Sequence, residues 1–107
     1  MKSPVFEVVV YKVKEEQLSK FLEQQPMAHA VVKNFPGFTS LHTLRSTDSP
    51  ATFVDYCEWE SLEAAQNANQ LAMHMPELQI FFELGDGMIS FGHYTSKLLT
   101  LHGGSAQ

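Results

Sequence analysis

Several polar side chains of this 107-residue chain could carry acid–base chemistry. A histidine exchanges protons readily near neutral pH, so we choose His74 as the first candidate for a general base or acid. Tyr56 is the candidate for a second catalytic group, because a phenolic hydroxyl can donate to a bound substrate. The side chains that we expect to line a pocket with them are Glu7, His42, Asp55, Trp59 and Tyr94.

Each of these residues also has a plainer structural interpretation. Asp55, Tyr56 and His42 stand in the middle of predicted strands, where polar groups are more often hydrogen-bonded or exposed than catalytic. Glu7 could lie in water at a frayed strand start, and Trp59 could simply pack in the core. Which side chains meet in one cavity depends on strand register, because a slip of one residue turns every side chain to the other face.

Other functional classes leave no trace in the sequence. A net charge of −5 with scattered Lys and Arg argues against nucleic acid and an anionic membrane surface as partners. The single cysteine, Cys57, excludes an internal disulfide and lacks an evident base, so we interpret it as a small apolar filler. The histidines lack metal-site spacing, and no phosphate loop, dinucleotide fingerprint or GxSxG motif is present. We therefore expect no metal.

The hydrophobic pattern predicts one domain over residues 1–107, with its core at about 5–94 and a C-terminal arm at 95–107. The N-terminal apolar run is too short for a signal peptide or a membrane span, so a cytoplasmic location is the default expectation. Predicted strands cover Val5–Val13, Phe38–Arg45, Ala51–Glu60 and Met88–Tyr94, with a short fifth strand or arm at Thr95–Leu101.

Two helical regions separate these strands. The first runs from Glu15 to about Phe35, and Pro26 should kink or restart it. The second begins after a capping Ser61, has a face of small residues in its middle, and continues in a further piece opened by Pro76. Gly85–Gly87 reads as the turn that ends it.

The resulting order, β-α-β-β-α-β, predicts a ferredoxin-like α+β fold with a four-stranded antiparallel sheet and both helices on one face. The first strand is apolar on both faces, with Phe6, Val8 and Val10 on one of them. An uncovered apolar face would be a large exposed patch in a monomer. We therefore expect a two-fold homodimer that packs sheet against sheet, with the arm protecting the partner's sheet edge.

The sequence resembles the dimeric α+β barrel superfamily and, within it, the antibiotic-biosynthesis monooxygenase family. The resemblance covers roughly residues 5–94, and the residues that carry it are Pro36-Gly37-Phe38, Glu58-Trp59-Glu60-Ser61, Glu63, Ala64 and His74. It implies a small pocket between sheet and helices, and a cofactor-independent monooxygenase, an oxidoreductase that acts on a small aromatic or polyketide-like substrate. His74 matches a helix histidine of one branch, and Trp59 an aromatic at the end of the third strand.

The sequence leaves two other functions open. One is a non-catalytic barrel that binds a small apolar ligand. The other is a polyketide-cyclase-like or isomerase-like enzyme that uses His74, since the related stress-barrel proteins carry a similar helix histidine.

Overall fold

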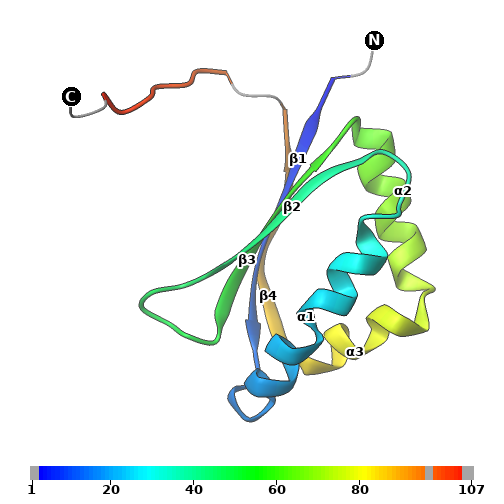
Figure 1. The fold of residues 1–107 in the computed structure, drawn as a ribbon, viewed down its shortest axis with the longest axis vertical. Coiled ribbons are helices and arrows are strands. Elements are labelled where there is room, and N and C mark those ends of the chain that lie inside the picture. Colours follow the sequence, from blue (N-terminus) through cyan, green and yellow to red (C-terminus); the bar gives the residue numbers. More distant parts are fainter. Residues whose placement is uncertain (1–2, 96–97, 105–107) are drawn as a thin grey trace.

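A computed structural model describes residues 3–95 and 98–104 of the chain, and its elements follow the predicted ferredoxin-like order. Four strands form one antiparallel sheet in the order β2-β3-β1-β4, and the helices lie together on one side of it (Figure 1). The elements are β1 (Val5–Val13), a 3-10 turn η1 (Glu15–Gln17), α1 (Leu18–Val32), β2 (Phe38–Arg45), β3 (Thr52–Trp59), α2 (Leu62–Met73), α3 (Pro76–Leu84) and β4 (Gly85–Tyr94).

Alternation along β1 and β3 divides the sheet into a helix-covered face and a bare face. Val5, Glu7 and Val13 of β1 are buried under the helices, as are Cys57 and Trp59 of β3. Phe6, Val8 and Val10 of β1 point the other way, as do Val54 and Tyr56 of β3, because successive side chains of a strand alternate. Figure 1 shows no helix on that second side of the sheet.

The first helix differs from its prediction in two places. Pro26 lies inside α1 and is exposed, and the helix neither stops nor restarts there. The helix ends at Val32 rather than near Phe35. The backbone N–H groups of Asn34 and Phe35 bond to the carbonyls three residues before them, so the chain tightens into turns ahead of Pro36.

The second helical region is capped as predicted. The Ser61 hydroxyl accepts from the backbone N–H of Ala64 at 3.1 Å, and Pro76 opens α3 as its first residue. The small face of α2 lies against the sheet, where Ala65 and Ala68 are buried.

The turn expected at Gly85–Gly87 is instead the start of β4. Gly85 pairs with Val13, and the β1–β4 register shifts on both sides of Tyr11. A β-bulge of this kind accommodates extra residues without ending the ladder. Gly87 takes a φ of 114° there, which an L side chain rarely adopts.

The buried residues form two clusters beneath the helices. The larger one centres on Trp59 and the alanines of α2, and the smaller one on Phe21 and Phe53, whose ring centroids are 4.7 Å apart. The larger cluster contains Ala28, Phe35, Cys57, Trp59, Ala65, Ala68 and Leu78. The smaller contains Val13, Phe21, Phe53 and Leu84.

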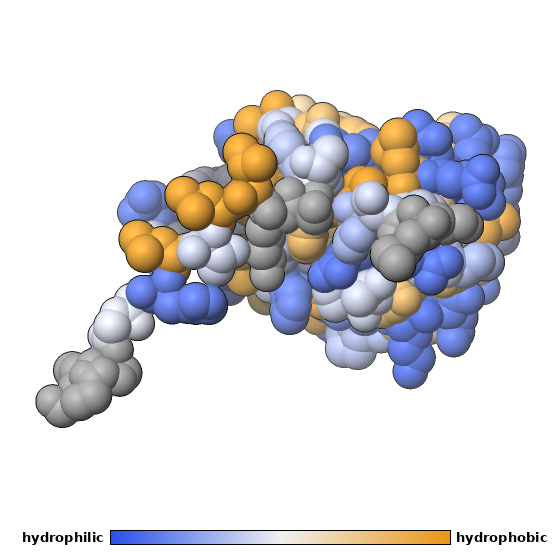
Figure 2. Space-filling model, turned by 90° about the horizontal axis from the view of Figure 1, so that it is seen from above, coloured by the Kyte–Doolittle hydropathy of each residue, from blue (hydrophilic) through white to orange (hydrophobic). Residues whose placement is uncertain are grey.

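Residues 98–104, the described part of the C-terminal arm, lie away from the sheet (Figure 1). Residues 98–104 contain no strand, and residues 96–97 of the predicted fifth strand lie outside the described part of the chain. Leu98, Leu99 and Leu101 are almost fully exposed, and Figure 2 shows hydrophobic residues along this arm. None of the helices in the described ranges has both the length and the apolar character needed to span a bilayer.

Cys57 lies under α2 and is 4% exposed. Burial, followed by the negative charges of Glu7 and Asp55, raises the pKa of its thiol to about 12. A thiol that stays protonated is a poor nucleophile.

We expect Cys57 of the folded protein to react with a maleimide at pH 8 on the order of a thousandfold more slowly than a free cysteine, because so little of it is thiolate. Mass spectrometry of timed samples measures the rate. The same chain in denaturant is the control and should react at the ordinary rate. Rapid labelling of the folded chain would contradict the burial described here.

The turn between α1 and β2 depends on Gly37. Its φ of 81° lies in the left-handed region, and a Cβ built on it would stand 2.5 Å from the Cβ of Ala64 on α2. Gly37 thus lets the turn approach the second helix. We expect Gly37→Ala to lower the free energy of unfolding by about 2 kcal/mol, through backbone strain and the clash.

Urea denaturation measures this loss, and Gly103→Ala is the matched control. Gly103 has open space around its Cβ position, so its substitution should change stability by less than about 0.5 kcal/mol. Equal stability of the two variants would show that the turn is not constrained as described.

Candidate functional site

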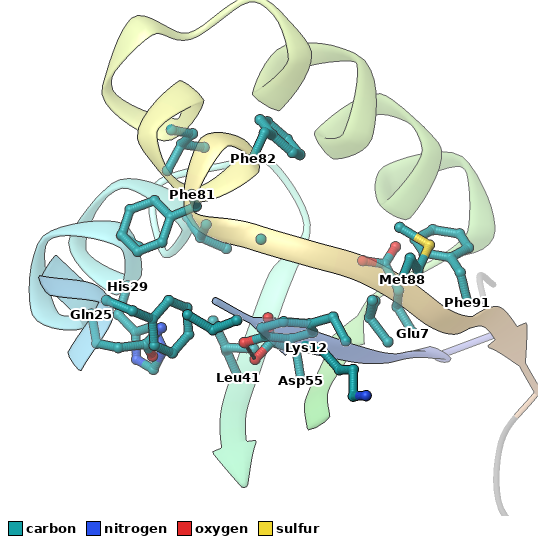
Figure 3. A pocket seen from close by; sticks show the side chains of 18 of the residues that line it. Glu7, Lys12, Gln25, His29, Leu41, Asp55, Phe81, Phe82, Met88 and Phe91 are labelled. Atoms are coloured by element: carbon teal, nitrogen blue, oxygen red, sulfur yellow. Dashed lines mark hydrogen bonds between the residues drawn. The ribbon is translucent and has the colours of Figure 1, made fainter. Parts of the chain in front are cut away.

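A cavity of about 410 Å³ lies between the sheet and the helices. Its walls are largely aromatic and aliphatic, and it reaches all four strands of the sheet and all three α-helices (Figure 3). The volume falls within the range of about 300–1,000 Å³ that is typical of small-molecule sites. Aromatic walls come from Tyr11, Phe21, Phe81, Phe82 and Phe91, and polar groups from Glu7, Lys12, Gln25, His29, Asp55 and Asn69.

A smaller chamber of about 160 Å³ adjoins the main cavity under α2. The residues that line only this chamber are Phe35, Cys57, Trp59, Ala68 and Ala72. The small side chains of α2 leave space there. The Trp59 indole N–H is buried and has no hydrogen-bond partner among the described residues. The residues shared by both spaces are Glu7, Val9, Val32, Leu41, Asp55 and Asn69.

The first polar cluster of the cavity is centred on Glu7. Its Oε1 lies 2.8 Å from Nε2 of His93 on β4 and accepts from the Asn69 side-chain amide of α2 at 3.2 Å. When His93 is protonated, the contact is an ion pair. Glu7 is 9% exposed, and a carboxylate buried to this extent needs such partners.

The second cluster is centred on Asp55 in the middle of β3. Its Oδ1 accepts from the hydroxyls of Tyr11 and Thr43, at 2.9 and 2.8 Å. Burial raises the pKa of Asp55, and the two hydroxyls and the nearby His29 only partly oppose that effect. Burial and the neighbouring Asp55 also raise the pKa of the Tyr11 hydroxyl, strongly. Asp55 is therefore a carboxyl group with increased proton affinity in a largely apolar cavity.

The two clusters are close neighbours on the sheet. Glu7 pairs with Cys57, and Asp55 is two residues from Cys57 on the same strand, so the carboxyl-bearing residues are diagonal cross-strand neighbours. Figure 3 shows Glu7, Met88 and Phe91 at one side of the cavity and His29 with Gln25 at the other. Within residues 3–95 and 98–104, no group of three potential metal-binding side chains occurs.

Three of the pocket residues expected from the sequence do lie at this site. Glu7 and Asp55 line both spaces, and Trp59 lines the smaller one while packing against Phe38 at 5.8 Å between ring centroids. Trp59 thus packs in the larger core cluster and also forms part of the wall of the smaller chamber.

Tyr56, His42 and Tyr94 lie instead on the bare face of the sheet. Tyr56 pairs with Val8 and His42, and its ring stacks on Phe6 at a centroid distance of 5.5 Å. The correction follows from register, because Asp55 and Tyr56 are consecutive on β3 and must point to opposite faces. A cavity that contains Asp55 therefore cannot also contain Tyr56.

His74 lies outside the cavity as well. It follows the last residue of α2, is exposed, and uses its backbone N–H to bond to the Leu71 carbonyl at 3.1 Å. The catalytic roles of His74 and Tyr56 stay predictions, and neither side chain is among the residues that line the cavity.

The residues that the sequence reasoning missed are Tyr11, His29, Asn69 and His93. Period-two alternation from Glu7 would have found Tyr11 on the same face of β1. His29 lies beside the apolar stripe of α1, a position that by itself favours solvent, yet it lines the cavity. No sequence signal joins His93 to Glu7, because strand pairing alone brings them together.

The fold is shared with several solved structures of low sequence identity. A candidate antibiotic biosynthesis monooxygenase from Bordetella bronchiseptica superposes with a TM-score of 0.79 at 16% identity, covering 92% of this chain and 100% of that one. A variant of SnoaB, a cofactor-independent oxygenase from Streptomyces nogalater, has a TM-score of 0.68 at 18% identity, covering 98% and 99%.

A conserved protein from Methanosarcina mazei Go1 gives a TM-score of 0.72 at 14% identity, covering 89% of this chain and 94% of that one. No curated protein matches the sequence. The family model for antibiotic biosynthesis monooxygenases, however, matches residues 4–75, which span β1 through α2 and most of the residues that line the cavity. The chain therefore belongs to the antibiotic biosynthesis monooxygenase family.

Proposed function

We propose that this protein is a cofactor-independent monooxygenase that acts on a small phenolic or polyketide-like aromatic substrate. Family membership supports the reaction class, and one structural relative is a cofactor-independent oxygenase. The aromatic walls of the 410 Å³ cavity suit a flat aromatic ring system.

The observation that carries the proposal is Asp55 in the wall of this cavity. In the proposed reaction its carboxylate takes the proton of an acidic substrate hydroxyl or C–H group, and the resulting anion passes electrons to dioxygen. Tyr11 and Thr43 both hold Oδ1, so they fix the carboxylate. The raised pKa of Asp55 makes it a stronger base than an exposed aspartate.

Glu7 is the proposed substrate-orienting group. Its Oε1 is already held by His93 and Asn69, and its second carboxylate oxygen can accept from another hydroxyl of the substrate. Aromatic neighbours such as Phe81 and Phe91 limit the water that reaches the two carboxylates.

A non-catalytic ligand-binding barrel is the alternative that one observation favours. Both carboxylates already have two hydrogen-bond partners in the free protein, as purely structural buried groups would have. Retention of an aromatic ligand without turnover would support this alternative. A cyclase that depends on His74 has less support, since His74 does not line the cavity.

Oxygen consumption with a panel of hydroquinones and anthrones tests the function. We expect Asp55→Asn to lower kcat/KM by about 10²- to 10⁴-fold, because the amide cannot accept the substrate proton. The amide oxygen can still accept from Tyr11 and Thr43, so aromatic ligands should bind with little change in affinity.

His74→Ala is the matched control, because it removes an exposed group away from the cavity, and we expect its uptake within about twofold of the wild type. If His74→Ala lost oxygen uptake while Asp55→Asn kept it, the assignment of Asp55 as the base would be overturned. Absence of uptake from every protein, with aromatic ligands still bound, would favour the binding barrel.

We also propose that two copies of the chain associate through the bare faces of their sheets. Phe6, Val8, Val10 and Val54 give this face a continuous apolar surface, and Leu44 on β2 is 55% exposed. The helices cover only the other face, so a second copy is the simplest cover. The exposed leucines of the arm would then pack on the partner.

Val10→Asp tests the dimer, because Val10 lies on central strand β1 between Val54 and Ser90. Two unpaired carboxylates would be buried at the interface, so we expect dimerisation to weaken on the order of a hundredfold or more. Sedimentation equilibrium measures the dimer dissociation constant. Gln70→Glu, which adds the same charge on exposed α2, should leave the dimer unchanged. A monomeric wild-type protein at high concentration would refute the proposal.

A further inference from the structure

The hydrogen-bonded chain that begins at Asp55 continues past the two hydroxyls that hold it. Thr43 donates to Asp55 Oδ1 at 2.8 Å, and Nε2 of His29 lies 3.1 Å from the same Thr43 oxygen. The three side chains come from β3, β2 and α1. They form a continuous path from a largely buried carboxyl group to a half-buried imidazole on a helix.

Counting hydrogens shows that this path can work in both directions. The Thr43 hydroxyl has one hydrogen, so while it donates to Asp55 its oxygen accepts from His29, which must carry its hydrogen on Nε2. When Asp55 is protonated and His29 has exchanged with water to the tautomer that carries its hydrogen on Nδ1, the order reverses. The carboxylic O–H donates to Thr43, and the hydroxyl donates to a bare Nε2.

We propose that His29 relays protons between Asp55 and water through the Thr43 hydroxyl. It does not touch the substrate and acts only through Thr43 and Asp55. The inference rests on the proposed function, in which Asp55 takes a proton from the substrate. The carboxylic proton passes to the Thr43 oxygen, and the hydroxyl hydrogen passes to Nε2 of His29. The imidazolium then loses its Nδ1 proton to water. One proton leaves, no electrons move, and Asp55 returns to the carboxylate.

Other routes from Asp55 to water are poor. The cavity in front of it has largely apolar walls and would be filled by a bound aromatic substrate, which excludes water. Tyr11, the second donor to Oδ1, gives up its own proton reluctantly, because burial and Asp55 raise its pKa. A histidine, in contrast, takes and releases protons near neutral pH.

Other titratable groups also face this region and would influence its pH response. They are Glu7, Tyr11 and Lys12 of β1, Cys57 of β3, and His93 of β4, which contacts Glu7. From α2 and α3 the residues lining the cavity are Asn69, Leu78, Phe81 and Phe82, none of which titrates.

Infrared spectroscopy after a rapid pH jump tests the path without turnover when oxygen is absent and an anthrone fills the cavity, so that water cannot reach Asp55 from that side. The carbonyl band of protonated Asp55, assigned by its loss in Asp55→Asn, reports the exchange rate directly. We expect the rate to fall roughly tenfold or more in His29→Gln, since glutamine can still donate to Thr43 but cannot pass a proton on. Thr43→Val should slow exchange similarly, and Thr43→Ser should restore it.

Unchanged exchange in His29→Gln would overturn the inference, as would Thr43→Ser behaving like Thr43→Val. Should Thr43→Val fail to fold, the comparison of His29→Gln with the wild type decides alone. Oxygen uptake gives the second readout. His29→Gln should lower kcat with KM unchanged, and imidazole in the buffer should restore kcat in His29→Ala.

The proton path and the proposed oxygenase function can fail separately. Slowed proton exchange in His29→Gln, together with no oxygen uptake by the wild type, would leave the path in place and remove the proposed function. Normal exchange in His29→Gln, with uptake that depends on Asp55, would keep the function and remove the path.

Discussion

The burial of two carboxyl groups on the helix-covered face of the sheet is the constraint on which the site depends. A carboxylate taken out of water is costly unless other groups hydrogen-bond to it. The chain meets this requirement with hydroxyls for Asp55 and with His93 and Asn69 for Glu7. These partners come from other strands and from α2. The hydrogen bonds that stabilise the buried carboxylates therefore also connect the elements of the fold to one another.

The cavity in front of these groups exists because of small residues on one helix. Ala65 and Ala68 are buried against the sheet, and Ala68 and Ala72 line the smaller chamber. Larger side chains would fill the space beside Glu7. Close approach is needed as well, and the left-handed turn at Gly37 supplies it by fitting against Ala64. The small residues of α2 thus leave room for a ligand beside the two packed clusters of the core.

The bare face of the sheet, in contrast, carries apolar side chains that no helix covers. Its apolar side chains gain little in a single chain, and the stacked rings of Phe6, Tyr56 and His42 lie there rather than in the cavity. Tyrosines and histidines of this sheet therefore divide between two environments. Tyr11 supports a buried carboxylate, whereas Tyr56, paired with Val8, lies on the bare face that we propose as the dimer interface.

The sequence by itself determined the order of the elements, the cap at Ser61, the helix start at Pro76 and the ferredoxin-like sheet, because these depend on local propensity and periodicity. Strand alternation also requires consecutive residues such as Asp55 and Tyr56 to lie on opposite faces, but the sequence could not say which face the helices cover. Only the tertiary structure decided that. Strand pairing set His93 beside Glu7, and packing of α1 brought His29 to Thr43, because contacts between distant segments follow from register and helix placement rather than from any local pattern.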